Sequence, residues 1–345
     1  MKIIILIFLT LYFPQLFAQG LRNTEWTQIK VERKDGSKIL DHSGAENAVI
    51  KYNFKEKTVL ISINNIFNSE LTYSVNDEIL NIGDFIKYKI DSSNSEILAL
   101  TQISKKELTD DKLNRYTFLN RHSIFEYLKN SGKIQIIGDS LIEYNNYFAP
   151  TYFGDINQLI IKEFETYDLN KKIYGFYILN SGGKIEDILF DENCKLKDNE
   201  IAKFLKMIKA TNGSWFLPET NKPYKYKINF GVDFTSMQPL SGVSFYYVSK
   251  GLTQEFTKSL SLNEMKEADN YFTKGNDLIS NKKYEKASKQ FIKCIEIDSF
   301  YIDAYYNLAF CYQKLDNKNF ACEIWNKLKI MGQKQGEYLY EETCK

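Results

Sequence analysis

The C-terminal region of the chain repeats itself at a spacing of 34 residues. Small residues recur at two positions of this repeat and bulky apolar residues recur at three. Small side chains let two helices approach closely, and bulky neighbours fill the space around such a contact. The repeat therefore predicts two helix pairs built on the same packing. The matching pairs are Tyr271 with Tyr305, Gly275 with Ala309, Leu278 with Tyr312, Ala287 with Ala321, and Phe291 with Trp325.

This pattern resembles the tetratricopeptide repeat (TPR), whose small and large positions it shares. We identify residues 263–345 as two such repeats followed by a capping segment, with turns inside the repeats at 281–283 and 316–318. The resemblance implies a concave surface that binds peptides and proteins. Because the region has 13 Lys, 13 Asp or Glu and no Arg, it does not predict a basic groove for carboxylates. Two repeats are fewer than the about three that a solenoid usually needs, so we expect the array to pack on the unit at 151–235 through residues 241–262, or to join another copy of the chain.

Residues 151–235 predict a second unit, with the order helix, two-stranded hairpin, helix and strand. Five positions are distinctive in it, namely Gly175, Gly183, Ile185, Trp215 and Pro218. On these residues the unit resembles the C-terminal domain of TonB-type energy transducers, which implies a periplasmic domain that pairs an edge strand with a receptor peptide. The chain lacks the Ser-Ser-Gly stretch, the uncleaved anchor and the Pro-rich spacer of that family, and the unit does not end the chain. A plain structural module is therefore the alternative.

Residues 21–120 contain short segments that alternate between apolar and polar residues with a period of two. Antiparallel strands at this spacing predict a small barrel or sandwich. The early Trp26 and the strand rhythm resemble the lipocalin-like domains. That resemblance implies a small apolar ligand in the mouth of the barrel, and a core filled by side chains is the alternative. We expect residues 121–150 to form a connector that contains a helical piece with Ile124, Tyr127 and Leu128, and residues 236–262 to form a linker.

The N-terminus predicts an export signal in residues 1–18, in which Lys2 precedes an apolar run and cleavage follows Ala18. The run is shorter than the ~20 apolar residues that an uncleaved anchor needs, and no later segment is long enough to span a membrane. The chain is therefore expected in the periplasm or outside the cell, where disulfides persist. A bridge between Cys322 and Cys344 is one option, and small buried residues of helices are the other.

The residues give little support to catalysis. Residues 138–141 (Gly-Asp-Ser-Leu) copy the nucleophile block of the GDSL hydrolases, in which a downstream His activates the Ser. The chain has only two His, His42 and His122, and both precede Ser140. We therefore predict that the chain is not an enzyme, and we assign no catalytic, cofactor-binding or metal-binding residue.

Taken together, these segments predict a multidomain α+β protein with an N-terminal antiparallel β barrel or sandwich, a central α+β domain and C-terminal α-helical hairpins. The formal net charge of +1 does not indicate a nucleic-acid partner. We interpret the chain as an exported periplasmic scaffold that binds envelope proteins through the TPR repeats and a TonB-like strand edge. The alternatives are binding of a small apolar ligand by the barrel and an accessory role in TonB-type transport. The oligomeric state stays open.

Overall fold

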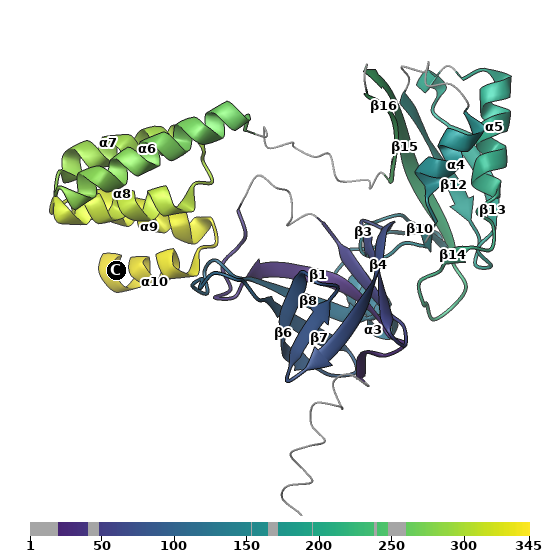
Figure 1. Cartoon of the computed structure of the whole chain (residues 1–345), viewed down its shortest axis with the longest axis horizontal. Helices are drawn as coiled ribbons and strands as arrows, with labels where there is room; N and C mark the ends of the chain where they lie inside the picture. Colours follow the sequence, from purple (N-terminus) through teal and green to yellow (C-terminus); the bar gives the residue numbers. More distant parts are fainter. Residues whose placement is uncertain are drawn as a thin grey trace, which may run out of the picture. The chain divides into compact units, whose positions relative to one another are not determined.

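The computed structural model describes residues 20–40, 48–152, 154–164, 172–194, 196–237, 240–247 and 260–345. The chain divides into two compact units (Figure 1). Unit 1 comprises Met1–Lys30, Ala48–Ile103 and Tyr116–Thr253, and unit 2 comprises Val31–Asn47, Ser104–Arg115 and Gln254–Lys345. The expected export signal and His42 lie outside the described residues. Among those that are described, no helix is long and apolar enough to cross a membrane.

Eight antiparallel strands form a closed barrel, which is one of the two architectures, barrel or sandwich, that the alternating segments predict. Their order is β4-β3-β2-β1-β8-β7-β6-β5, and a further pairing of β4 with β5 closes the ring. The short strand β11 (Thr151–Tyr152) pairs with β4, and β14 (Trp215–Phe216) pairs with β11. The barrel strands are β1 (Glu25–Arg33), β2 (Ile50–Phe54), β3 (Thr58–Ile63), β4 (Ile66–Asn76), β5 (Ile79–Ile82), β6 (Ile86–Ser93), β7 (Ile97–Gln102) and β8 (Asn114–Asn120).

Aromatic rings fill the interior of the barrel. The Tyr52 and Phe118 rings stack with centroids 5.2 Å apart, and the Tyr52 and Tyr88 hydroxyls lie 3.3 Å apart. Trp26 and Phe54 are fully or almost fully buried in the same cluster. Rings at these separations stabilise one another in addition to burying apolar area. This packing favours a core filled by side chains over an enclosed apolar ligand.

The central part of the chain forms a second sheet with two helices, α4 (Ile156–Glu163) and α5 (Asp198–Lys209) (Figure 1). The elements follow the predicted order of helix, hairpin, helix and strand. The ranges expected as connector and linker also contain regular structure, namely α3, β9, β10 and β16. The remaining elements are α3 (Arg121–Asn130), β9 (Ile136–Ile137), β10 (Leu141–Glu143), β12 (Lys172–Leu179), β13 (Ile185–Phe190), β15 (Lys225–Met237) and β16 (Leu240–Tyr247), with a 3-10 turn at Glu192–Cys194.

Strand β15 is paired on both of its sides. Strand β12 covers one side from Lys172 to Leu179, and β10 and β16 share the other side. The sheet order is β13-β12-β15-β10-β9, with β16 added to β15, so β13 is an outer strand. The last strand of the predicted α+β unit therefore offers no open edge along the residues that β10 and β16 cover.

Candidate protein-binding surface

Five consecutive helices form the C-terminal part of unit 2 (Figure 1). Ser261 caps the first helix, because its hydroxyl accepts a hydrogen bond from the Glu264 N–H at 3.2 Å and the Glu264 carboxylate accepts one from the Ser261 N–H at 2.8 Å. The turns inside the helix pairs contain Lys282 and Asp316, with φ angles of 58° and 54°. These two residues are 34 positions apart, so the backbone repeats with the sequence. The helices are α6 (Leu262–Ser280), α7 (Tyr284–Ile297), α8 (Ile302–Lys314), α9 (Lys318–Ile330) and α10 (Lys334–Cys344).

The ten repeat positions lie in two apolar clusters between these helices. The three Ala of the repeat are fully buried, and Gly275 faces the Phe291 ring. The first cluster is formed around Phe291, and the second is formed around Trp325. The structure places Tyr271, Gly275, Leu278, Ala287 and Phe291 in the first helix pair, and Tyr305, Ala309, Tyr312, Ala321 and Trp325 in the second.

One further core position, not among the ten predicted ones, recurs at the same spacing. Cys294 and Leu328 are 34 residues apart, and both are fully buried. Burial raises the pKa of the Cys294 thiol to about 12 and that of the neighbouring Cys311 thiol to about 11. These thiols are therefore small apolar parts of the core. Comparing apolar character, and not size, at the same spacing identifies this position.

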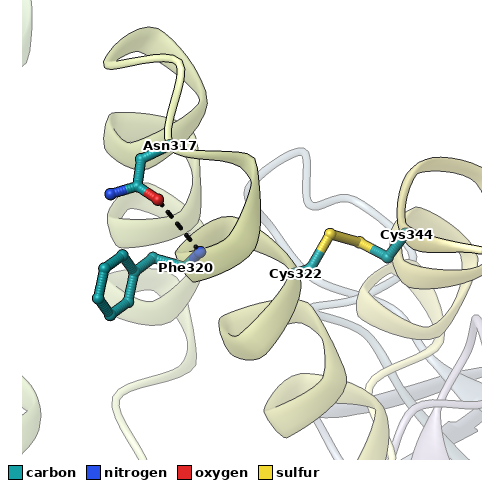
Figure 2. Close-up of a disulfide and its surroundings, with 4 residues drawn as sticks. All are labelled: Asn317, Phe320, Cys322 and Cys344. Atoms are coloured by element: carbon teal, nitrogen blue, oxygen red, sulfur yellow. Dashed lines mark hydrogen bonds between the residues drawn. A yellow bond between two sulfur atoms is a disulfide. The ribbon is translucent and has the colours of Figure 1, made fainter.

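A disulfide joins Cys322 of α9 to Cys344 of α10 (Figure 2). The two Cα atoms lie 5.7 Å apart, within the usual range for such a bridge. Figure 2 also shows Asn317, whose side chain accepts a hydrogen bond from the Phe320 N–H at the start of α9. The disulfide therefore links α10 covalently to α9, and Asn317 caps the N-terminus of α9.

One face of α8 is bordered by α6, the first helix of the preceding pair, and by α10, the helix that follows α9. Asn307 donates a hydrogen bond to Asn276 of α6 at 2.8 Å, and the Tyr306 hydroxyl accepts one from the Gly336 N–H of α10 at 3.0 Å. The Phe310 side chain is exposed, with the Lys314 ammonium 5.3 Å from its ring. Residues three or four apart share one side of a helix. We call this surface the α8 face, and it comprises Asp303, Tyr306, Asn307, Phe310 and Lys314.

Two segments from the N-terminal half of the chain complete unit 2 beside this face. The Lys112 ammonium lies 2.7 Å from the Asp303 carboxylate. The Lys38 N–H donates to the Gly332 carbonyl at 3.1 Å, and the Gln333 side chain donates to the Lys38 carbonyl at 2.9 Å. Segments 31–40 and 104–115 therefore supply packing partners for an array of only two repeats.

A polar cavity of about 180 Å³ lies where these segments meet the helices. Its charged lining has three cations and three anions, so no single sign dominates it. Tyr301 and Tyr306 add hydroxyl-bearing rings to the same wall. Such a lining is suited to the mixed donors and acceptors of a peptide more than to an ion of one sign. The charged residues are Arg33, Lys38, Lys112, Asp35, Asp111 and Asp303.

Ser140 of the GDSL-like block and His122 contact different residues. Ser140 is exposed in the turn before β10, and its carbonyl accepts a hydrogen bond from the Lys225 N–H at 2.8 Å. His122 lies in α3 and contacts the carboxylate of Glu219. Within the described ranges, no group of three or more His, Cys, Asp or Glu is arranged to hold a metal ion.

The residues of the TonB-like pattern have structural roles in the second sheet. A Cβ atom on Gly175 would lie 2.4 Å from the Leu189 carbonyl oxygen, so the close approach of β12 and β13 requires glycine there. Gly183 has a φ of 72° in the hairpin turn, and Ile185 begins β13. Trp215 is buried in β14, and the Pro218 carbonyl accepts a hydrogen bond from the Tyr226 hydroxyl at 3.5 Å.

Part of this chain matches a known family model. Residues 275–316, from the middle of α6 to the turn after α8, match the family model described as TPR repeat. A comparison with curated proteins finds no match for the chain. The helix pairs, their 34-residue period and this match agree with one another, and the C-terminal part of the chain therefore contains TPR repeat structure.

Proposed function

We propose that the chain is an exported scaffold protein that binds a protein partner in the periplasm through its TPR helices. The observation that carries this proposal is the α8 face, where the exposed Phe310 lies on the same side of the helix as the hydrogen-bonding Asn307 and the charged Asp303. Aromatic anchors surrounded by polar groups are typical of protein-binding surfaces. The mixed charges of the adjoining cavity favour a peptide segment as the bound part of the partner.

Two features support export. The first is the leader of residues 1–18, with a positive start, an apolar run and a small residue at its end. The second is the Cys322–Cys344 disulfide, because such bridges persist in oxidising compartments and are rare in the cytosol. Mass spectrometry of the protein purified from its own cells tests this part of the proposal. We expect a chain that begins at Gln19 and is 2 Da lighter than its reduced form, one hydrogen being lost from each thiol. A chain that retains residues 1–18 and two reduced thiols would contradict it.

The binding surface is tested by quantitative cross-linking in envelope extracts with the mature protein as bait. Phe310→Glu places a charge at the centre of the α8 face, and we expect partner capture to fall about tenfold or more. Ile330→Glu is the matched control, since Ile330 is a highly exposed apolar residue at the end of α9. Equal capture by wild type and both variants would place the binding surface elsewhere.

A second proposal follows from the TonB-like pattern of the central unit. Strand β13 is an outer strand of its sheet, and Leu189 on it is 54% exposed. An outer strand with an exposed apolar residue is suited to pairing with an extended peptide. Some partners could still be captured by the Phe310→Glu variant. We expect Leu189→Glu to abolish the capture of those partners. If both variants capture every partner as well as wild type, this strand edge has no such role.

A further inference from the structure

A small cavity in unit 1 lies between the outer side of the barrel and the chain that covers it. Strands β1 and β2 supply one wall, and the start of α3 with segments 147–151 and 216–218 supplies the other. The volume of about 40 Å³ has room for about three water-sized groups. The groups that matter to its chemistry are Glu25, Lys51, Asn53, Arg121, Tyr147 and Phe216.

Two of the three charged residues that line this cavity neutralise each other. The Glu25 carboxylate oxygen Oε1 accepts hydrogen bonds from Arg121 Nη1 at 3.1 Å and from Asn53 Nδ2 at 2.9 Å. Arg121 also donates to the Leu217 carbonyl at 2.7 Å, and its guanidinium lies 4.4 Å from the centre of the Phe216 ring. Arg121 is therefore held in place by partners on several sides.

Lys51 has no such partner among the described residues. Its ammonium donates one long hydrogen bond, of 3.3 Å, to the carbonyl of Ala149. An ammonium group has three donors, so two of them remain to be satisfied. Burial lowers the pKa of Lys51 to about 7, and attraction to Glu25 opposes this only in part. A cation in this position is stabilised by any anion that fits beside it.

We propose that this cavity binds a small monovalent carboxylate, such as formate or acetate, with the Lys51 ammonium as its counter-ion. The charged residues of the lining, Lys51, Arg121 and Glu25, sum to one positive charge, which one carboxylate neutralises. Glu219 is not part of the cavity lining. Its carboxylate contacts both Arg121 and His122. Because covalently bonded atoms lie closer together than separate waters, room for about three waters limits the anion to about four non-hydrogen atoms. The Tyr147 and Phe216 rings provide an apolar wall for the carbon end.

Binding should be coupled to proton uptake. The titratable or charged groups that line the cavity beside Lys51 are Glu25, Arg121, Tyr52 and Tyr147. Of these, Glu25 is the one with a carboxyl group, and burial raises its pKa. At pH 8 most Lys51 side chains are neutral in the empty site, and a bound carboxylate restores the charged form. Uptake therefore approaches one proton per anion at pH 8 and falls toward zero at pH 6.

The proposal is tested by calorimetric titration of the mature protein with sodium acetate, with sodium chloride at equal ionic strength as the reference. At pH 8, two buffers of different ionisation enthalpy give the number of protons taken up. Lys51→Met should abolish acetate binding, whereas Lys89→Met, on the exposed side of β6, should leave it unchanged.

Three outcomes would overturn the proposal. Acetate could give the same heat as chloride, binding could survive Lys51→Met, or binding could occur at pH 8 without proton uptake. The proton measurement uses the wild-type protein alone, so it still decides the matter if Lys51→Met fails to fold. None of these results bears on the α8 face, which lies in unit 2.

Discussion

A Cβ atom on Gly275 of α6 would lie 2.5 Å from Cε1 of Phe291 on α7, and the Phe291 ring is fully buried. The two helices therefore approach as closely as glycine allows. Gly275→Ala should lower the stability of this helix pair by about 1 kcal/mol, because overpacking costs about 1–3 kcal/mol and the helix propensity of Ala returns up to about 1. Amide hydrogen exchange in α6 and α7 measures the effect. In a Phe291→Leu background the same change should cost less, and an equal cost would show that the ring is not responsible.

The Cys322–Cys344 bridge closes a loop with a sequence separation of 22 residues. Constraining an unfolded loop of this length stabilises the folded state by about 3 kcal/mol. Gly336 is the one buried residue of α10, so this helix depends strongly on the bridge. We expect reduction to speed amide exchange in α10 and to lower the melting temperature of unit 2. The Cys322→Ser, Cys344→Ser double variant should behave like the reduced protein and should not respond to reductant. A double variant as stable as the oxidised protein would exclude this role for the bridge.

The indole N–H of Trp215 donates a hydrogen bond to the Thr211 hydroxyl at 2.9 Å, and both residues are buried. The same hydroxyl donates to the Ile208 carbonyl at 2.6 Å. Thr211→Val leaves the indole N–H without an acceptor and should destabilise unit 1 by about 1–3 kcal/mol in urea unfolding. Thr211→Ser keeps the hydroxyl and should cost much less. Similar losses in the two variants would assign the effect to the missing methyl packing.

The sequence predicts the helical part of the chain well because each helix pair repeats one local packing arrangement. Gly275 and Ala309 lie at equivalent places in that arrangement, as do Lys282 and Asp316 in the turns. The strands of the barrel were predictable for a similar reason, since period-two alternation places Tyr52 and Phe54 on the inner side of β2. Local periodicity predicts these strands but leaves open whether they form a barrel or a sandwich, because the pairing of β4 with β5 closes the ring.

Contacts between distant segments could not be predicted in this way. The bond from Gln333 to Lys38 joins residues 295 positions apart, and nothing in segment 31–40 indicates that it packs beside TPR helices. Strand β16 falls in a range expected as linker, because its partner β15 and not its own sequence fixes its role.

The cavity beside Lys51 could not be predicted, for the same reason. Lys51 and Asn53 lie on the side of β2 that faces away from the barrel interior, where alternation predicts contact with solvent. Residues 147–151 and the first turn of α3 instead cover this side. The sequence thus predicts the direction of the Lys51 side chain, while a segment about a hundred residues later determines its burial.

The half-buried Lys51 should give unit 1 a stability that rises with pH. Its folded pKa of about 7 lies below its unfolded value of ~10.4. Between these values the unfolded chain binds more protons, so in buffer free of small carboxylates stability increases by up to about 1.4 kcal/mol per pH unit. Buried tyrosines such as Tyr52, whose pKa is raised, oppose this trend above about pH 10. Urea unfolding followed by Trp fluorescence should show Lys51→Met more stable than wild type at pH 7, with the difference shrinking toward pH 9. Parallel stability curves would mean that the Lys51 ammonium is solvated in the folded protein.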